Sequence, residues 1–302
     1  MNFPICSPAC CSIEEPSYLE LDQLRSQIGG KRRRYARLDH LLLTKVSVYE
    51  FLFDTDHEDL VVDTIYNADF VVGYFRPGSY ADGVTHNNNG RHVRQLYLAY
   101  CELSPEMLAL TLAQMSSLET LHFDHVRLIP YPPGEGTPSD LLNIVVQRFS
   151  SSKYSKRPLS LSLVDQRLSS LKVRKFGSRF SEEAYLSMSA IPQLRMLSLA
   201  GNGLKAIDNV NFFHRKGFGV PLSELWYLDL SGNQLETLGE VETWLPPSVT
   251  SLHLEGNWIL SLPAAFESVT PKALARLNSL AELWIGELVG RGGGGFRGST
   301  NF

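Results

Sequence analysis

The stretch that decides the fold is residues 194–204, which read LRMLSLAGNGL. Residues 225–235 read LWYLDLSGNQL and residues 249–259 read VTSLHLEGNWI, so the same frame recurs. Each copy has an apolar residue at its first, fourth, sixth and eleventh positions and an asparagine at its ninth. Alternate residues of a strand share one face, so the fourth and sixth positions predict a short strand with one apolar face. Recurrence of the frame predicts an array of stacked units.

Weaker copies extend the array on both sides. Residues 93–103 fit with a cysteine in the asparagine position, residues 118–128 with a valine, and residues 158–168 with a glutamine. A decayed last copy begins at Leu280. Leucine follows the same distribution, because 37 of the 46 leucines lie between residues 93 and 290. Each unit buries its leucines only against its neighbours, so several units must stack before the array is stable.

The connectors between the copies contain predicted helices. Residues 104–106 (Ser-Pro-Glu) combine an N-cap serine with a proline at the first helical position. Residues 139–140 precede a second helical stretch, and residues 181–183 start a third. Residues 211–219 lengthen one copy and carry three phenylalanines, which either pack on the convex side or form an exposed loop. Strands followed by helices predict an α/β solenoid.

The chain resembles leucine-rich repeat proteins over residues 93–290. The resemblance implies a curved horseshoe with a parallel sheet on its concave face and with helices and loops on its convex face. It also implies that the recurring asparagines bond backbone groups of neighbouring coils, which gives a ladder of satisfied buried polar groups. In this family the concave face binds partners. The expected members of the ladder are Asn202, Asn233 and Asn257.

Four regions follow from these patterns. Residues 1–30 are expected to be a flexible N-terminal tail, and residues 31–92 to be either an N-terminal cap or degenerate repeats. Residues 93–288 form the leucine-rich repeat domain, with about seven repeats. Residues 289–302 are a Gly/Arg-rich tail that cannot form a packed element and is expected to be disordered.

Two interpretations of residues 31–92 stay open. A frame that starts at Leu38 and a looser one that starts at Ile65 predict two degenerate repeats. Alternatively, residues 80–93 are similar to the entry of receptor-like and bacterial leucine-rich repeat arrays, which predicts a separate cap. In both cases the region covers the apolar end of the first full repeat.

Side chains between the inward leucines are expected on the concave face. Several are aromatic, and aromatic residues supply many of the hot spots of protein interfaces. Acidic and histidine side chains lie among them. The sequence therefore predicts a partner-binding surface on this face. Its expected members are Tyr97, His122, Trp226, Tyr227, Asp229, His253, Glu255 and Trp284.

A catalytic site is not expected. Ser198, Asp229 and His253 occupy the same position in three successive copies, so we expect them side by side. Nucleophilic catalysis needs the histidine between the other two, because it takes the serine proton. The expected row has Asp229 in the middle instead. The sequence therefore predicts no enzyme activity and no small-molecule substrate.

A metal site is not expected either. His122 and Asp124 share a strand face, but a third ligand would have to come from Tyr97 or Ser162. Neither tyrosine nor serine is a common zinc ligand. The acidic loop at residues 54–59 lacks the glycine and the glutamate of a calcium-binding loop. We expect no metal and no cofactor.

Charge is uneven along the chain. Residues 145–180 contain nine Lys or Arg and one Asp, a balance of +8, whereas residues 220–288 contain nine acids and two bases, a balance of −7. The net charge is −4, so a general attraction to nucleic acid or to an anionic membrane is not implied. The acidic segment favours a protein partner with a basic stretch.

These features predict a non-enzymatic scaffold that binds a protein or peptide on its concave face. The alternative is an RNA-associated protein that uses residues 145–180 and the Gly/Arg-rich tail. The sequence shows no secretory signal, no disulfide framework and no apolar stretch long enough to span a membrane. The expected location is therefore intracellular, and cytoplasmic rather than nuclear.

Overall fold

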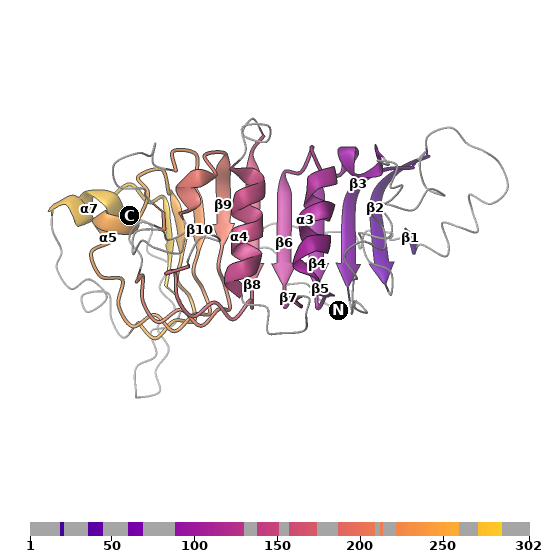
Figure 1. Ribbon diagram of the computed structural model, residues 1–302. Coiled ribbons are helices and arrows are strands. Elements are labelled where there is room, and N and C mark those ends of the chain that lie inside the picture. The colour runs from indigo at the N-terminus through magenta and orange to yellow at the C-terminus, as the bar shows by residue number, and fades with distance from the viewer. Residues whose placement is uncertain are drawn as a thin grey trace, which may run out of the picture.

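A ten-stranded parallel sheet is the main feature of the computed structural model (Figure 1). Each strand lies beside the next sheet strand along the chain, so the chain must return over one face after every strand, as in a solenoid. The residues that the structure describes are 19–20, 36–44, 60–68, 88–129, 138–150, 157–173, 187–208, 212–213, 222–259 and 271–285. The sheet strands are β1 (Leu19–Glu20), β2 (Ala36–Thr44), β3 (Leu60–Ala68), β4 (Gln95–Ala99), β6 (Thr120–Asp124), β8 (Leu159–Val164), β9 (Leu194–Ser198), β10 (Tyr227–Asp229), β11 (Ser251–His253) and β12 (Glu282–Trp284).

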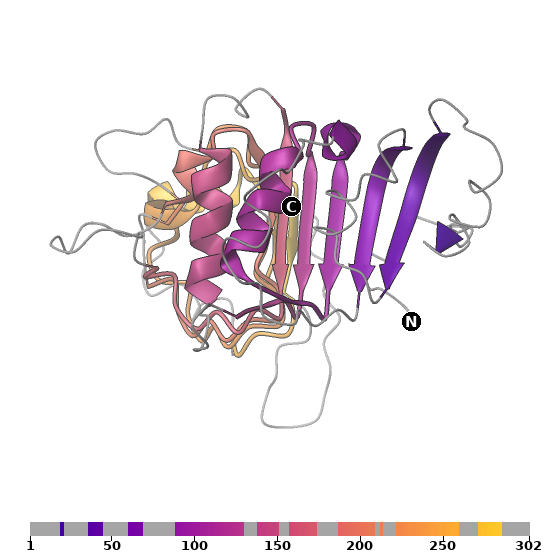
Figure 2. The same cartoon turned by 45° about the vertical axis from the view of Figure 1, so that its right-hand side comes forward.

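Helices in the return segments cover one face of the sheet (Figure 2). The α-helices are α3 (Pro105–Gln114), α4 (Pro138–Phe149), α5 (Val241–Trp244) and α7 (Pro271–Leu277), and the 3-10 turns are η2 (Asn88–His92) and η3 (Met188–Ala190). The predicted α/β solenoid is confirmed. Within the described residues, no helix has both the length and the apolar character needed to cross a bilayer.

Two predicted helix starts coincide with α3 and α4. Ser104 is the N-cap of α3, where its hydroxyl accepts a hydrogen bond from the amide of Met107 at 3.1 Å. The guanidinium of Arg148, near the end of α4, donates to the carbonyls of Leu112 and Ala113 at 2.8 and 2.9 Å. These carbonyls lie in the last turn of α3, so Arg148 joins the two helices. The third predicted start, at residues 181–183, lies outside the described residues.

The inward strand positions are filled by buried side chains. From β4 to β11 the fourth and sixth positions of every copy are at most 2% exposed. Complete burial of such a side chain contributes about 1.5–3 kcal/mol. The last copy is weaker, because Leu280 is 9% exposed and Leu283 is half-buried. The residues of the well-buried set are Leu96, Leu98, Leu121, Phe123, Leu161, Leu163, Leu197, Leu199, Leu228, Leu230, Leu252 and Leu254.

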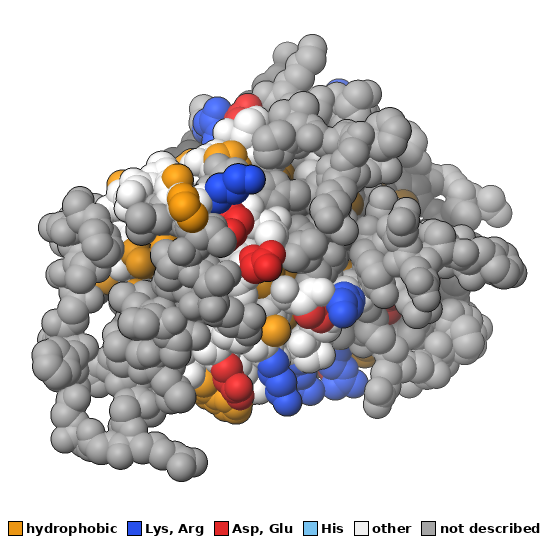
Figure 3. Space-filling view, turned by 90° about the vertical axis from the view of Figure 1, so that its left-hand side faces the viewer, with side chains coloured by type: hydrophobic (Ala, Val, Ile, Leu, Met, Phe, Trp, Pro, Cys, Tyr) orange, Lys and Arg blue, Asp and Glu red, His pale blue; other side chains and the backbone are white. Residues whose placement is uncertain are grey.

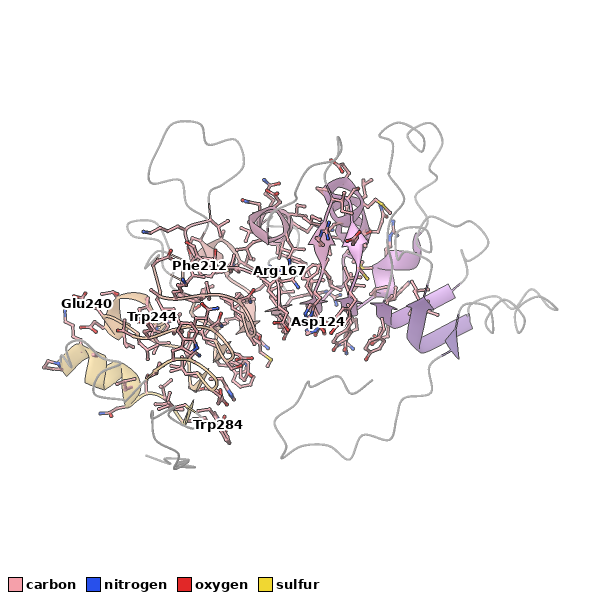
Figure 4. All side chains as sticks on the ribbon, turned by 90° about the horizontal axis from the view of Figure 1, so that it is seen from below. Asp124, Arg167, Phe212, Glu240, Trp244 and Trp284 are labelled. Atoms are coloured by element: carbon pink, nitrogen blue, oxygen red, sulfur yellow. The ribbon has the colours of Figure 1, made fainter. Side chains whose placement is uncertain are left out.

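The phenylalanines of the long insertion pack on the convex side. Phe212 and Phe213 are fully buried, and their rings meet edge to face at 5.1 Å. Phe213 also contacts Trp244 at 5.8 Å. Viewed along the strands, Phe212 and Trp244 lie on the outer side of the curved array, whereas Trp284 lies on its inner side (Figure 4). The third phenylalanine, Phe218, lies outside the described residues.

The N-terminal strands continue the sheet, but in one case with a different frame. Leu41 and Leu43 are fully buried at the inward positions of β2. The looser frame that starts at Ile65 is wrong, because Ile65 pairs with Leu41 and Leu96 and so occupies the fourth position. Strand β1 falls within residues 1–30, where a flexible tail was expected, and pairs with β2. The other boundaries of the flanking regions stay predictions.

The frame of the copy at β8 also needs a correction. The sequence placed Pro158 in its first position, but Leu159 pairs with Leu194 and is 1% exposed, so Leu159 fills that position. The next pair is Ser160 with Met196, which leaves one extra residue in β9. A bulge of this kind lets two strands of unequal spacing pair without loss of their inward leucines.

An asparagine ladder clamps the C-terminal coils together. The Oδ1 atom of Asn233 accepts a hydrogen bond from the amide of Leu204 at 3.1 Å. Its Nδ2 donates to the carbonyls of Leu199 and Leu230, both at 2.9 Å. Leu199 and Leu204 belong to the preceding coil and Leu230 to the same coil, so one side chain bonds two coils. The same pattern recurs at two further positions, Asn202 and Asn257.

The coils that lack this asparagine are joined by backbone pairing instead. Strands β5 (Glu102–Leu103) and β7 (Arg127–Leu128) form a second, two-stranded parallel sheet directly after Cys101 and Val126. The amide of Arg127 donates to the carbonyl of Cys101 at 2.8 Å. Gln166, in the next coil, bonds the carbonyl of Val164 at 2.7 Å. Two kinds of cross-coil bonding therefore follow one another along the solenoid.

We expect Asn233→Leu to lower the free energy of unfolding by about 1–3 kcal/mol, because it leaves buried amide and carbonyl groups of two coils unpaired. Gln166→Leu is the matched control, since Gln166 occupies the same position but bonds only a carbonyl two residues away. Its effect should be smaller. Urea titrations followed by circular dichroism measure both, and equal losses would contradict the ladder's role.

Candidate functional site

The concave face of the sheet presents an aligned row of side chains. The strand register places one residue of each strand, from β3 to β12, directly beside the next. We name this set the central row. The predicted binding residues lie in it or beside it on the same coils. The central row consists of Tyr66, Tyr97, His122, Ser162, Ser198, Asp229, His253 and Trp284.

Four rings at the C-terminal end form a continuous contact, which we name the C-terminal aromatic patch. Trp226 meets Tyr227 edge to face at 5.8 Å, and Tyr227 contacts the ring of His253 at 4.9 Å. His253 in turn stacks on Trp284 at 5.8 Å with an interplanar angle of 12°. Trp226 and Trp284 are 44% and 40% exposed, so large indole surfaces face solvent. Exposed tryptophans held by packed rings are typical of interface anchors.

Three carboxylates, those of Asp229, Glu255 and Glu282, border this patch. Asp229 accepts a hydrogen bond from the Ser198 hydroxyl at 2.9 Å. The row has Asp229 between Ser198 and His253, the order that does not support nucleophilic catalysis. Glu255 Oε1 lies 3.1 Å from Nδ1 of His253, whereas its Oε2 is buried without a hydrogen-bond partner among the described residues. A buried acceptor without a partner costs free energy, and a hydrogen-bond donor from a bound molecule would remove this cost.

A second arrangement on β11 has the order that nucleophilic catalysis needs. The Ser251 hydroxyl lies 3.1 Å from Nε2 of His253, whose Nδ1 faces Glu255. Ser251 is 3% exposed, however, and its hydroxyl also bonds the carboxylate of Glu282 at 3.0 Å. The Ser251 amide is engaged with the carbonyl of Trp226. A negative charge beside the serine opposes the oxyanion that such chemistry must stabilise. The bonds therefore order the side chains rather than activate the serine.

A separate aromatic group lies at the N-terminal end of the central row. Tyr66 and Tyr97 stack at 4.7 Å, and Tyr97 contacts His122 at 5.6 Å. Burial lowers the pKa of His122, and the carboxylate of Asp124 partly opposes this shift. Three strand spacings, about 14 Å, separate His122 from Asp229. The eight predicted residues therefore form two groups, and Tyr66 was missed because the frame at β3 was misassigned.

Ion pairs run along the edge of the concave face where the strands begin. Arg94 donates to Glu119 at 2.7 Å, and Arg157 contacts the same carboxylate at 3.2 Å. The hydrogen bond from Arg94 lowers the pKa of Glu119, with a further contribution from Arg157. Exposed pairs of this kind add little stability each. They nevertheless engage Arg157, which belongs to the basic segment at residues 145–180.

The eighth position of the frame, just before the asparagine position, adopts a left-handed backbone conformation in six coils. An L-residue pays about 1–2 kcal/mol there, and glycine does not. Three C-terminal coils use glycine: Gly201, Gly232 and Gly256 have φ of 67°, 64° and 68°. Three N-terminal coils instead keep larger side chains: Tyr100, His125 and Asp165 have φ of 55°, 51° and 52°.

These larger side chains gather around His125 at the edge of the concave face. Nδ1 of His125 lies 2.6 Å from Oδ1 of Asp124 and 3.8 Å from Oδ2 of Asp165. Tyr100 stacks on the His125 ring at 4.7 Å with an interplanar angle of 14°. Burial raises the pKa of Asp165, and the carboxylate of Asp124 raises it further against the effect of His125. We name Asp124, His125 and Asp165 the edge cluster; Figure 4 labels Asp124.

The sequence did not identify Asp165 as a member of this group. It expected any third ligand beside His122 to come from Tyr97 or Ser162 in the central row. Asp165 follows β8, one coil further, at the left-handed position that carries glycine in other copies. The sequence does contain an indication of this residue, because Asp165 occupies a position of the frame that is glycine in three other copies.

We expect Gly201→Ala to lower the free energy of unfolding by about 1–2 kcal/mol, since Gly201 has φ of 67°. The added Cβ would also collide with the carboxylate of Asp165. Gly203 is the matched control, because a Cβ there meets nothing closer than 3.9 Å. Gly203→Ala should change stability by less than about 0.5 kcal/mol. Equal effects in thermal denaturation would refute the assigned backbone conformation.

The chain is similar to parts of several known proteins. No protein-family model matches the chain. Podocan of Mus musculus is 35% identical over 108 residues, which cover 34% of this chain and 16% of podocan. The TLR13 chain of a complex with ssRNA13 superposes with a TM-score of 0.41 and 14% identity, over 90% of this chain and 38% of TLR13. The plant peptide hormone receptor RGFR1, in complex with RGF2, gives 0.40 and 12%, over 84% of this chain and 42% of the receptor.

The chain thus spans about a sixth of podocan, and less than half of each structural neighbour. The structure itself shows the repeat frame from β4 to β11. Leucines at the fourth and sixth positions form one buried strand face per coil, and asparagines at the ninth position bond successive coils. The chain therefore has the fold of a leucine-rich repeat solenoid.

Proposed function

We propose that the protein is a non-enzymatic interaction scaffold that binds a partner protein or peptide at the C-terminal aromatic patch. The observation that carries the proposal is the solvent exposure of Trp226 and Trp284, at 44% and 40%, within a set of mutually packed rings. Trp284 lies in β12, and Trp226 directly precedes β10, where its backbone bonds both neighbouring coils. The indoles are therefore preorganised and lose little entropy on binding. Such rigid aromatic surface is the usual centre of an interface.

The polar surroundings of the patch specify the partner's chemistry. Glu255 has a buried, unpartnered oxygen within the described structure, and Asp229 and Glu282 add two further negative charges nearby. A lysine or arginine of the partner would supply the missing donor and complement the charge. At the end of the array, described acidic and basic side chains are interspersed (Figure 3), so charge over that end gives no single-sign field. We infer a partner with a basic residue next to an apolar anchor.

The rival function, RNA association through residues 145–180, receives less support from the described residues. Arg148 is engaged with two carbonyls at the end of α3, and Arg157 pairs with Glu119. Arg167 and Lys172 are exposed. The remaining basic residues of the segment and the Gly/Arg-rich tail lie outside the described structure.

The test compares variants in affinity purification from cells, with and without RNase, followed by binding measurements on the captured partner. We expect Trp226→Ala and Trp284→Ala each to lose about 2 kcal/mol or more of affinity, roughly 30-fold. Both variants should fold, because neither indole is buried in the core. Glu255→Lys should slow association and reduce its salt dependence, and it should also speed dissociation, because it removes the acceptor for the partner's basic side chain.

Trp258→Ala is the matched control, because Trp258 is 51% exposed but follows Asn257, outside the central row. It should bind the partner as the unmodified protein does. The proposal fails if Trp226→Ala and Trp284→Ala retain the partner. Loss of binding with RNase, or on neutralising Lys172, Arg174 and Lys175, would support RNA association instead.

A further inference from the structure

The edge cluster brings three metal-ligating side chains together from two adjacent coils. Asp124 and His125 follow one another at the end of β6, and Asp165 comes directly after β8. One ligand atom from each residue can be chosen so that all three lie within 4.8 Å of one another. We propose that Asp124, His125 and Asp165 bind a divalent transition-metal ion such as Zn²⁺. This inference does not depend on the proposed partner-binding patch, which lies further along the sheet, at β10 to β12.

The donor set has the composition that such an ion requires. Zinc takes imidazole nitrogen and carboxylate oxygen as ligands at about 2.0–2.2 Å, so neighbouring ligand atoms around a tetrahedral ion lie about 3.4 Å apart. The distances from His125 Nδ1 are 2.6 Å to Asp124 and 3.8 Å to Asp165, on either side of this value. Small side-chain rotations therefore equalise them. Two carboxylates and one imidazole also leave net negative charge for a cation to neutralise.

A second imidazole lies near the cluster. His122 is 7% exposed and lies two residues before Asp124, on the same face of β6. Its ring contacts Tyr97, and it does not belong to the group of side chains whose ligand atoms come within 4.8 Å of one another. His122 therefore borders the proposed site without supplying a ligand.

The backbone of the cluster is adapted to hold these side chains. His125 and Asp165 occupy the left-handed position that is glycine in three other coils. The next coil has Gly201, and a Cβ at that residue would occupy the place of the Asp165 carboxylate. The ring of Tyr100 covers one face of His125 and so restricts its rotation. The chain thus has ligand residues at two strained positions, and glycine in the next coil leaves space for the Asp165 carboxylate.

The experiment is a titration of the full chain with Zn²⁺ by isothermal calorimetry, together with thermal denaturation with and without the ion. The background carries Cys6→Ser, Cys10→Ser and Cys11→Ser, because these cysteines are an alternative zinc-binding set. We expect one saturable site and a higher melting temperature with zinc. Asp165→Asn and His125→Gly should each weaken binding at least about tenfold and abolish the shift of the melting temperature.

His125→Gly also provides an internal check on folding. Glycine suits the left-handed backbone at this position, so the metal-free variant should melt no lower than the parent protein. Tyr100→Gly is the matched control, since it changes the same position of the preceding coil without removing a ligand, and it should bind zinc within a few-fold of the parent. Absence of a saturable site in the parent protein overturns the proposal. The proposal is also overturned if Asp165→Asn and His125→Gly bind zinc as tightly as the parent protein does.

Discussion

The structure depends most on the hydrogen bonds that join one coil to the next away from the sheet. Sheet pairing fixes the concave side, but the chain must also be held where it turns into the convex side. In the C-terminal half, Asn202, Asn233 and Asn257 do this by bonding the carbonyls of two coils and an amide of the preceding one. Those buried groups would otherwise be unpaired. In this half, the bonds keep successive coils in register behind the leucine core.

The two halves of the solenoid use different hydrogen bonds to join their coils, and the edges of their concave faces carry different side chains. Where asparagine is present, the preceding residue is glycine, so the turn is unstrained and no side chain projects from the left-handed position. Where it is absent, β5 and β7 pair through their backbones, and Tyr100, His125 and Asp165 project from strained positions. The edge cluster therefore belongs to the N-terminal half, whereas the exposed indoles of Trp226 and Trp284 belong to the C-terminal half.

The sequence predicted the fold well because its frame reports burial directly. A leucine two residues from another can only face the same side of a strand, so Leu228 and Leu230 defined both the element and its orientation. The frame failed where this signal weakened. In the copy at β8 the frame put Pro158 in the first position, which Leu159 fills. The frame at Ile65 was three residues off, which hid Tyr66. Contacts between coils, such as that of Asp165 with His125, depend on which residues of neighbouring coils lie side by side. The repeat frame describes one coil at a time and does not predict these contacts.

The most direct test of the ladder is hydrogen exchange at the amides of Leu168, Leu204 and Leu235, each of which donates to an asparagine Oδ1. These amides lie beyond the sheet strands, so their protection depends on the asparagine side chains. Protection factors measured by NMR should match that of the Leu230 amide, which follows β10 and donates to the carbonyl of His253 in the next coil. Exchange at the rate of exposed turns would show that the asparagines do not bind the coils together and would contradict the account.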